Sequence, residues 1–474
     1  MGKLEEFLQA NYGFEQFRPG QKEVLTELLD HKSLLAILPT GNGKSLCYQF
    51  YGHYTNQRVL IVSPLLALMQ DQVNQMRYQG YGRVVALTSE QDYFTRRLVL
   101  ENLASYQYIF LAPEILQNQA ILTRLKQVGI GLLVVDEAHC ISVWGPDFRP
   151  DYLKLGQLRQ ALQQPVTLAL TATATPKVAN DIKQQLGLTN VYRRSVNRPN
   201  IYLDVIKVAD QKEKDQRLLQ LVTFLAGPGL VYFSSKKLAS KLARWLTDNS
   251  DLKVAAYHAG LSMAERYSVL QQFLQGQLDV VCATSAFGMG INKGDIRYVI
   301  HYHLTGDLNN YVQEIGRAGR DGLQSAALLL YQPGDEYLQK KLIDSSLPTT
   351  IEIEAYFKGG HLPKEKIRLL AGISQEKSRS EELTAFFEHR KAERLAALDK
   401  MVVYANSSGC LRQVILDYFD EKALVHKSAH CCHANALFET LTQLGLKKAE
   451  KRPVKQQARQ GYEHYLQKLF ANYQ

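Results

Sequence analysis

Residues 34–45 have the sequence LLAILPTGNGKS, in which an apolar run leads through a glycine-containing loop to Lys44 and Ser45. Such a run is typical of a buried parallel strand, and a glycine loop between strand and helix turns backbone N–H groups toward phosphate. Lys44 would reach the β and γ phosphate oxygens, and the Ser45 hydroxyl would ligate Mg²⁺. Leu38 stands where the usual motif has its first glycine, so an ordinary glycine turn is the alternative for this stretch alone. The other loop residues that we assign to nucleotide binding are Thr40, Gly41, Asn42 and Gly43.

A second apolar run, residues 132–135, ends in two acids, Asp136 and Glu137. A buried parallel strand delivers such carboxylates to the crevice beyond its carboxyl end, where wound α/β sheets bind their ligands. We expect Asp136 to hold Mg²⁺ and Glu137 to orient the attacking water. The two stretches together predict a site that hydrolyses ATP.

Apolar runs alternate with helical stretches as far as residue 335, which is the pattern of wound parallel α/β sheets. The predicted strands of a first domain are 34–38, 59–62, 84–87, 108–111, 132–135 and 166–170, and those of a second are 229–233, 253–257, 279–283, 298–302 and 326–331. Helices with charged faces follow from residue 351 to 419. We therefore predict an α/β chain with domains at 1–205, 206–335 and 336–440 and a basic tail at 441–474.

Composition and charge narrow the class of protein. Hydrophobic residues make up 46% and charged residues 22%, which is ordinary for a globular chain, and no apolar run approaches membrane-spanning length. Acids occupy the first residues where a signal peptide would be apolar, so we expect a cytoplasmic protein without membrane contact and with reduced cysteines. The formal net charge of +10 favours a polyanionic partner.

Two arginines, Arg317 and Arg320, stand three residues apart at the end of the second predicted domain, so we expect both on one helical face. If that face looks at Lys44, they can neutralise charge on the transferring phosphoryl group as arginine fingers. A solvated basic helix is the alternative, but Gly316 and Gly319 indicate close backbone approach. We also count Gln313 among the catalytic residues.

In the order of these motifs, residues 10–335 resemble the superfamily-two DNA helicases of the RecQ family. The resemblance implies two RecA-like domains, and it makes residues 13–21 an adenine-recognition segment in which Phe14 stacks, Arg18 contacts the nucleotide and Gln21 hydrogen-bonds adenine. A glutamine amide offers both a donor and an acceptor, which suits the adenine edge. Segments such as 62–72, 171–174 and 283–293 resemble motifs that contact the DNA strand or couple it to ATP. The DNA-facing residues implied are Ser63, His258 and Thr284.

The loop at 143–149 matches the aromatic-rich loop of the family, which distinguishes it from RNA helicases of the DEAD-box type. In the resemblance, Trp144, Phe148 and Arg149 would contact single-stranded DNA and couple it to the two acids. Val143 and Pro146 depart from the usual glutamine and histidine, which puts the strength of that coupling in question. Two aromatics packed in an interdomain core are the alternative.

The region after residue 400 resembles the zinc-binding domain of the family only in part. Cys410 is the expected first ligand, but His430-Cys431-Cys432-His433 replaces the later cysteines, and Asn435 stands at the last one. Zinc accepts thiolate and imidazole, so Cys410 and three of these four residues could assemble a tetrahedral site, and we select Cys410, Cys431, Cys432 and His433. A metal-free helical platform is the competing interpretation.

The resemblance is to a short bacterial RecQ type, since the 39 residues after Asn435 are too few for winged-helix and HRDC domains at about 50 residues per domain. We expect an ATP- and Mg²⁺-dependent helicase that moves 3′ to 5′ on single-stranded DNA and unwinds duplex DNA in recombination and repair. We expect it to act as a monomer and to meet DNA repair proteins. An ATP-driven RNA remodeller and a non-catalytic DNA-binding scaffold are the other two hypotheses.

Overall fold

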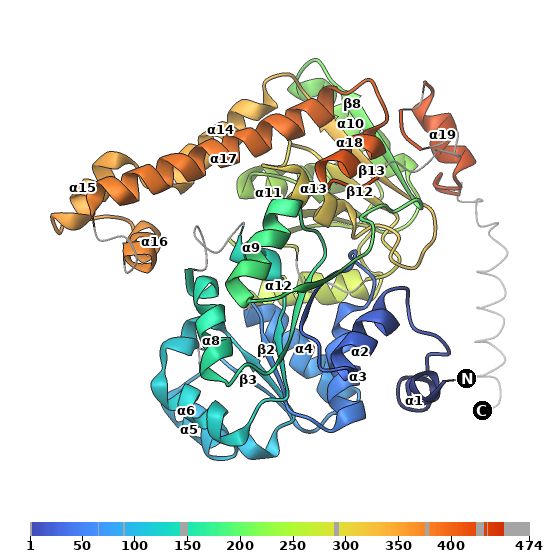
Figure 1. Cartoon of the computed structure of the whole chain (residues 1–474). Helices are drawn as coiled ribbons and strands as arrows, with labels where there is room; N and C mark the ends of the chain where they lie inside the picture. The colour runs from blue at the N-terminus through green and yellow to red at the C-terminus, as the bar shows by residue number, and fades with distance from the viewer. Residues whose placement is uncertain are drawn as a thin grey trace, which may run out of the picture.

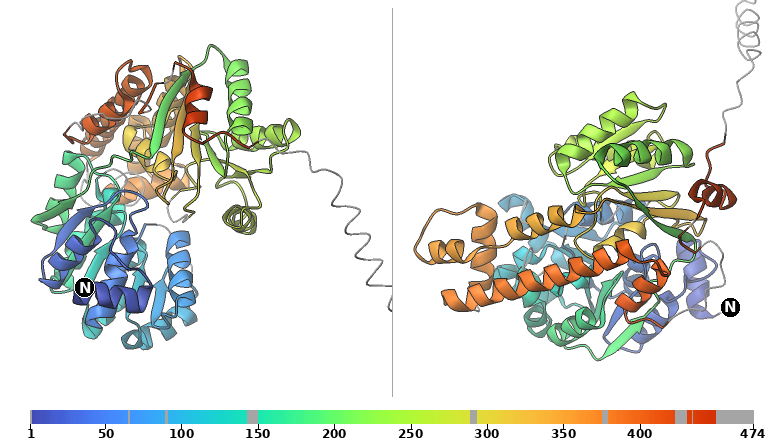
Figure 2. Two further views of the ribbon diagram at one scale, coloured as in Figure 1. Left: turned by 90° about the vertical axis from the view of Figure 1, so that its right-hand side faces the viewer. Right: turned by 90° about the horizontal axis from the view of Figure 1, so that it is seen from above.

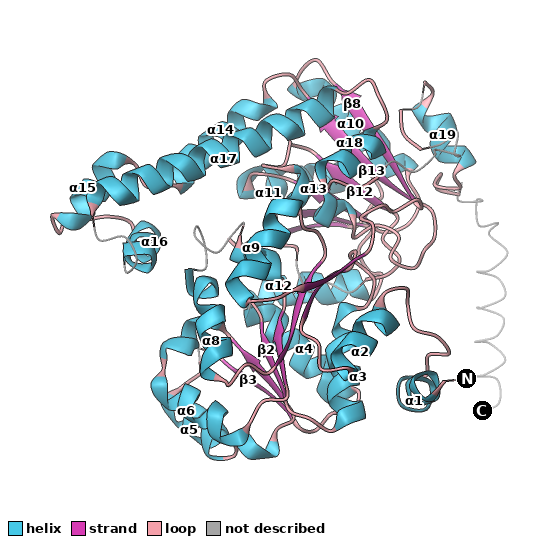
Figure 3. Cartoon of the chain, in the orientation of Figure 1, coloured by secondary structure: helices cyan, strands magenta, loops and turns pink. Residues whose placement is uncertain are grey.

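Two parallel sheets and a helical arm make up the computed structural model of the chain (Figure 1). The structure describes residues 2–64, 66–88, 91–142, 150–288, 293–374, 379–422, 431–433 and 435–449. Strands of each sheet lie inside a layer of helices (Figure 3). The predicted class, two RecA-like α/β domains followed by helices, is confirmed.

The first sheet has the order β3-β4-β2-β5-β6-β1-β7, and all of its pairings are parallel. Its strands are β1 (Leu34–Ile37), β2 (Val59–Val62), β3 (Val84–Leu87), β4 (Tyr108–Leu111), β5 (Leu132–Val135), β6 (Val166–Thr171) and β7 (Asn190–Arg193). The sequence analysis found all but β7. That edge strand has no fully buried residue, so it lacks the apolar run that marked the others.

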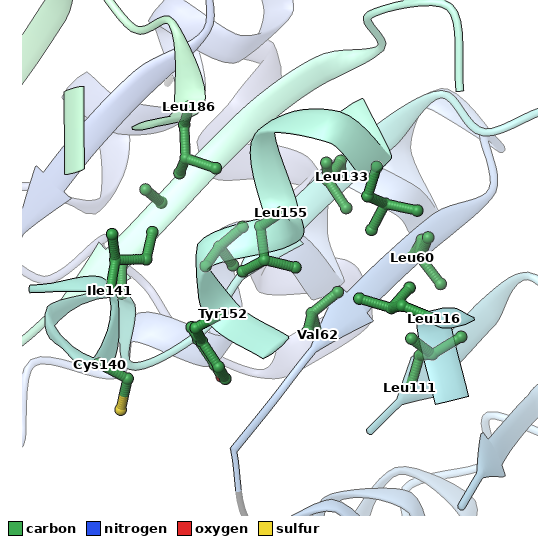
Figure 4. Packing of buried hydrophobic residues seen from close by; sticks show 14 of the residues in the cluster. Leu60, Val62, Leu111, Leu116, Leu133, Cys140, Ile141, Tyr152, Leu155 and Leu186 are labelled. Carbon is green, nitrogen blue, oxygen red and sulfur yellow. The ribbon is translucent and has the colours of Figure 1, made fainter. Parts of the chain in front are cut away.

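Helices cover both faces of this sheet and bury two apolar clusters against it. In one cluster, Val62 and Leu133 of the central strands pack near Tyr152 of a short 3₁₀ helix (Figure 4). The helices are α1 (Lys3–Tyr12), α2 (Gln21–Leu29), α3 (Lys44–Thr55), α4 (Leu66–Tyr78), α5 (Tyr93–Glu101), α6 (Gln119–Val128), α8 (Leu155–Ala161) and α9 (Pro176–Leu186). Short 3₁₀ helices are η1 (Leu103–Ser105), η2 (Pro113–Gln117), η3 (Ala138–Ile141) and η4 (Pro150–Lys154).

The second sheet has the order β10-β11-β9-β12-β13-β8 and is also parallel. Its strands are β8 (Ile201–Lys207), β9 (Gly229–Tyr232), β10 (Val254–Tyr257), β11 (Val280–Ala283), β12 (Tyr298–His301) and β13 (Ser325–Tyr331), and its helices are α10 (Gln211–Phe224), α11 (Lys236–Asp248), α12 (Met263–Leu274) and α13 (Leu308–Ile315). Because β8 pairs with β13, the predicted boundary at residue 205 falls inside a strand of the second domain. β8 is not among the predicted strands, and without it the sequence offered no strand to mark the start of the second domain before residue 205.

Four of the remaining helices form an arm that leaves the second domain and reaches over the first (Figures 1 and 2): α14 (Asp335–Ser346), α15 (Thr350–Phe357), α16 (Lys364–Ser374) and α17 (Ser380–Asn406). The last two helices, α18 (Leu411–Tyr418) and α19 (Leu437–Gln443), pack on the second domain, and α19 lies on the side away from the arm (Figure 1). Ion pairs join the arm to the first domain, one between Lys177 and Glu393 and one of 3.6 Å between Arg368 and Glu114. At its other end, α18 buries Leu411 and Leu416 in the core of the second domain.

Within the described residues, no helix has the length and apolar character needed to cross a bilayer.

Candidate active site

The predicted phosphate loop connects β1 to α3, in the order strand, loop, helix. Gly41 and Gly43 have φ values of 88° and 68°, in the left-handed region that side chains disfavour. Lys44 is the first residue of α3 and Ser45 the second, so both lie at a helix N-terminus where backbone N–H groups are free to meet an anion. The predicted phosphate-binding residues, Thr40 to Ser45, therefore form one loop and the start of the helix that follows it.

The predicted adenine-recognition segment is bonded to this loop. The Gln21 side chain donates from Nε2 to the carbonyl oxygens of Asn42 and Gly43, each at 2.9 Å, and its Oε1 accepts the backbone N–H of Arg18 at 2.9 Å. The Arg18 guanidinium donates to the Gly41 carbonyl. Phe14, in contrast, is 52% exposed between α1 and α2. Both amide hydrogens of Gln21 are thus used within the protein, and an adenine could engage only the oxygen.

The two acids follow β5 directly, as predicted. Asp136 continues the ladder, since its N–H donates to the Val62 carbonyl at 2.9 Å, and its Oδ1 accepts the N–H of Glu137 at 3.0 Å. Burial and the charge of Glu137 raise the pKa of Asp136 above its ordinary value. Burial opposes ionisation of Glu137 too, but Lys44 and His139 lower the pKa of its carboxyl. The positive charges around the pair therefore favour an ionised Glu137.

His139, which the sequence analysis left without a role, links Glu137 to the end of β6. Its Nδ1 lies 3.3 Å from Glu137 Oε2 and 3.1 Å from the Thr171 hydroxyl, which itself donates to the Thr173 carbonyl at 2.9 Å. The Thr173 hydroxyl oxygen in turn accepts a hydrogen bond of 3.2 Å from Gln313 Nε2 of the second domain. A chain of polar contacts therefore runs from the Glu137 carboxylate across the domain junction. The position of His139 two residues after Glu137 was the signal in the sequence.

Arg317 and Arg320 do not share a helical face, contrary to the prediction. Helix α13 ends at Ile315, and the arginines lie in the turn that follows, where Gly319 has a φ of 55°. The helix cap, Gly316, keeps right-handed backbone angles with a φ of −61°, whereas Gly319 adopts a left-handed conformation that glycine reaches without steric cost. The turn nevertheless delivers both side chains to the first domain.

Arg320 reaches the phosphate loop from the second domain, and Arg317 lies near Glu137 of the first. A β-carbon placed on Gly41 would lie 2.9 Å from Cγ of Arg320, so the stem of that side chain lies on the loop. Arg317 is only 6% exposed and donates to the Gly288 carbonyl, while its Nε makes no hydrogen bond within the described part of the chain. Burial and the neighbouring charge of Arg317 lower the pKa of Arg320 to about 9. The junction thus holds more positive charge than its own carboxylates balance.

The oxygen ligands needed for Mg²⁺ are present in this cluster. Ser45 offers a hydroxyl and Asp136 a carboxylate, and hard divalent cations prefer such oxygen donors. These residues fit the predicted metal.

The residues predicted to face DNA are found at the carboxyl ends of strands. Ser63, His258 and Thr284 follow β2, β10 and β11, and all three side chains are buried. The Ser63 hydroxyl has no hydrogen-bond partner among the described residues, whereas the His258 ring contacts the Ser240 hydroxyl at 2.7 Å. The remaining predicted contacts, Trp144, Phe148 and Arg149, lie outside the described residues.

Three of the four predicted zinc ligands come together beside α18. The sulfur of Cys410 lies 3.8 Å from that of Cys431 and 3.6 Å from that of Cys432. His433 is turned elsewhere, with its Nε2 at 2.8 Å from the Gly409 carbonyl oxygen. The thiols fit a soft metal such as zinc, and among the described residues the cluster of ligand atoms contains these three sulfurs without a nitrogen of His433.

Comparison with known families agrees with this geometry. The DEAD/DEAH box helicase family matches residues 18–182, and the helicase conserved C-terminal domain matches 213–322. The probable ATP-dependent DNA helicase RecS of Bacillus subtilis is 43% identical over 442 residues, which cover 89% of each chain. The chain belongs to the RecQ family of DNA helicases. The RecQ zinc-binding family matches residues 368–434, which include α18 and the three cysteines.

Longer members of the RecQ family are similar over part of their length. The ATP-dependent DNA helicase RecQ of Pasteurella multocida is 37% identical over 74% of this chain, which spans 56% of that protein. Among solved structures, helicase Lhr of Mycobacterium smegmatis bound to single-stranded DNA and AMP-PNP gives a TM-score of 0.58 at 20% identity over 85% of this chain and 57% of its own. At that identity the likeness to Lhr shows a shared fold.

We expect Gly41→Ala to lower the ATPase rate by about tenfold or more, because the added methyl group would displace Arg320 from the loop. Gly80→Ala is the matched control, since Gly80 has a similar φ of 93° and nothing within 4 Å of an added β-carbon. It should cost only backbone strain, about 1 kcal/mol of stability, and leave the rate unchanged. Steady-state phosphate release measures both, and equal rates in the two variants would contradict the contact.

Proposed function

We propose that this RecQ-family helicase hydrolyses ATP at the junction of its two α/β domains and uses closure of that junction to move 3′ to 5′ along single-stranded DNA. One observation carries the proposal: Arg320 of the second domain lies on the phosphate loop of the first. The rate of hydrolysis can therefore be high only when the domains are together. Product release then separates them, which is how such motors advance.

The proposed roles follow the position of each group. Lys44 and the loop N–H groups hold the phosphates, and Ser45 and Asp136 hold Mg²⁺, which supplies Lewis-acid stabilisation when bound. Glu137, kept ionised by its neighbours, accepts a hydrogen bond from the attacking water and orients it. Arg317 and Arg320 neutralise charge that develops on the transferring group. Gln313 connects this step to Thr173.

DNA binding is proposed to act on the same two acids through the segment that joins η3 to η4. His139 in η3 contacts Glu137, and Tyr152 in η4 donates its hydroxyl to the Asp136 carbonyl at 3.2 Å. Both ends of the aromatic-rich segment therefore touch a catalytic acid. This supports a role for Trp144, Phe148 and Arg149 in sensing single-stranded DNA, and it favours the enzyme over a non-catalytic scaffold.

We further propose that the three thiols of Cys410, Cys431 and Cys432 bind one zinc ion. A hydrogen bond from Cys432 and one from the Arg412 guanidinium, whose Nε lies 3.2 Å from the Cys431 sulfur, lower the pKa of the Cys431 thiol to about 4. Thiolate is the form that binds zinc. Monomeric action in the cytoplasm, and a place in recombination and repair beside other repair proteins, complete the proposal.

Single-stranded DNA should stimulate ATP hydrolysis, and single-stranded RNA should do so far less. Lys44→Ala should reduce hydrolysis by about a hundredfold or more while DNA binding remains measurable, because the lysine contacts phosphate and not DNA. Steady-state phosphate release with each polymer tests both statements. Normal turnover by Lys44→Ala would overturn the site, and stronger stimulation by RNA would favour an RNA remodeller.

The direction of movement is tested with two duplexes that differ only in the end that carries the single-stranded tail. We expect unwinding of the 3′-tailed duplex and little unwinding of the 5′-tailed one, with a blunt duplex as the control. Strand separation on a native gel is the measurement. A preference for the 5′ tail would reverse the proposed polarity.

Zinc content should follow the cysteines and not His433. We expect about one zinc per chain in the purified protein, loss of zinc in Cys410→Ser and Cys431→Ser, and retention in His433→Ala, since the His433 ring lies outside the cluster of the three sulfurs. Atomic emission spectroscopy measures the metal directly. Zinc that survives both cysteine substitutions would mean a different ligand set.

A further inference from the structure

An arginine in the segment between the two sheets joins both halves of the nucleotide site. Arg198 lies between β7 and β8, and all five of its N–H groups face an acceptor. Nη1 contacts the carbonyl oxygens of Thr40 at 3.0 Å and Gly316 at 3.3 Å, and Nη2 contacts those of Ala318 at 3.0 Å and Gly319 at 2.7 Å. Nε lies 3.4 Å from Asn200 Oδ1. One guanidinium therefore bonds the phosphate loop and the arginine-bearing turn at once.

We propose that Arg198 is a positioning residue for ATP hydrolysis, which holds the turn containing Arg317 and Arg320 in register with the phosphate loop. The inference rests on the proposed function only in taking those two arginines as the groups that stabilise the transferring phosphoryl. Arg198 itself directs its Nη hydrogens to backbone carbonyls and its Nε hydrogen to Asn200 Oδ1, so it has no donor left for a phosphate oxygen. Its effect on the reaction must pass through the turn.

The turn is held from a second direction by Asn200. Its Nδ2 donates to the Gly319 carbonyl at 2.9 Å and to the Leu323 carbonyl at 3.0 Å. A β-carbon on Gly319 would lie 2.5 Å from this same nitrogen, so the fit leaves no room for adjustment. The two polar side chains fix the path of the backbone between Arg317 and Arg320, and small misplacements of catalytic groups are costly.

The helical domain fixes the backbone of Arg198 in turn. Arg412 of α18 donates from Nη1 to the Arg198 carbonyl at 2.9 Å and to Asn197 Oδ1 at 2.8 Å, and from Nη2 to the Ile201 carbonyl at 2.6 Å. A small cavity beside both arginines is lined by apolar groups that include Val312 and Leu416. Hydrogen bonds in such surroundings are stronger than in water. The backbone around Arg198 is thus held in place by Arg412, so the Arg198 guanidinium can keep the two domains in register.

Lysine cannot reproduce this arrangement. Its ammonium has three donors at a single point, whereas the planar guanidinium reaches carbonyls on opposite sides in a rigid fork. A residue that merely anchored the segment through charge would tolerate lysine. A residue that sets the register of two domains would not.

The test compares Arg198→Ala and Arg198→Lys with Arg193→Ala. Arg193 is the matched control, because it also crosses between domains to a carbonyl, that of Phe419 at 3.2 Å, yet touches neither the phosphate loop nor the turn. We expect kcat to fall by about tenfold in both Arg198 variants. The affinity for a fluorescent ATP analogue should stay within about threefold, and the melting temperature should stay near that of the Arg193 variant.

Each result then has one meaning. A kcat for Arg198→Lys equal to that of the wild type, or an equal loss in Arg193→Ala, would overturn the positioning role. The lysine variant also guards against an alanine variant that fails to fold. A wild-type protein without ATPase would instead refute the proposed function, and a normal rate for Arg317→Ala would refute the assigned finger, so the failures are distinguishable.

Discussion

An excess of positive charge at the domain junction is the constraint on which the active site depends. Lys44 and His139 act on both Asp136 and Glu137, Arg317 and Arg320 lie near Glu137, and Arg198 lies near Arg320, so the cations come from both domains and from the segment between them. Like charges held close together are costly unless an anion lies among them. A nucleotide polyphosphate is such an anion. The junction is therefore arranged so that binding of the substrate relieves repulsion between the parts that must come together.

Local sequence patterns were sufficient to predict the elements of the first domain that carry its part of this site. An apolar run that ends in two acids, and another that ends in a glycine loop, each carry their function at the end of one strand. The parallel pairing of the strands then brings both ends to one edge of the sheet. This is why the positions of Asp136, Glu137 and Lys44 could be predicted from periodicity and spacing alone.

What the sequence did not reveal depends on contacts between distant segments. Arg198 has no local pattern, because its five acceptors come from three separate stretches of chain. The spacing of Arg317 and Arg320 fits a helix equally well, and only the tight packing at Gly319 shows that a turn is required. His433 was predicted as a zinc ligand because of its chemistry. In the structure its ring contacts the Gly409 carbonyl and lies outside the cluster of the three cysteines. Residue type predicts what a group can do, and the fold determines what it meets.

The bonding of Gln21 has a consequence for how the enzyme distinguishes one base from another. Its amide hydrogens already hold the carbonyls of Asn42 and Gly43, so a base that bonds to the Gln21 oxygen contacts a side chain that supports the phosphate loop. Recognition of the base and the position of the phosphate loop are then coupled through Gln21. A nucleotide with the wrong base could still place its phosphates in the loop, yet leave the loop displaced from the arginine turn. Discrimination between nucleotides would therefore appear in the rate of the chemical step more than in the tightness of binding.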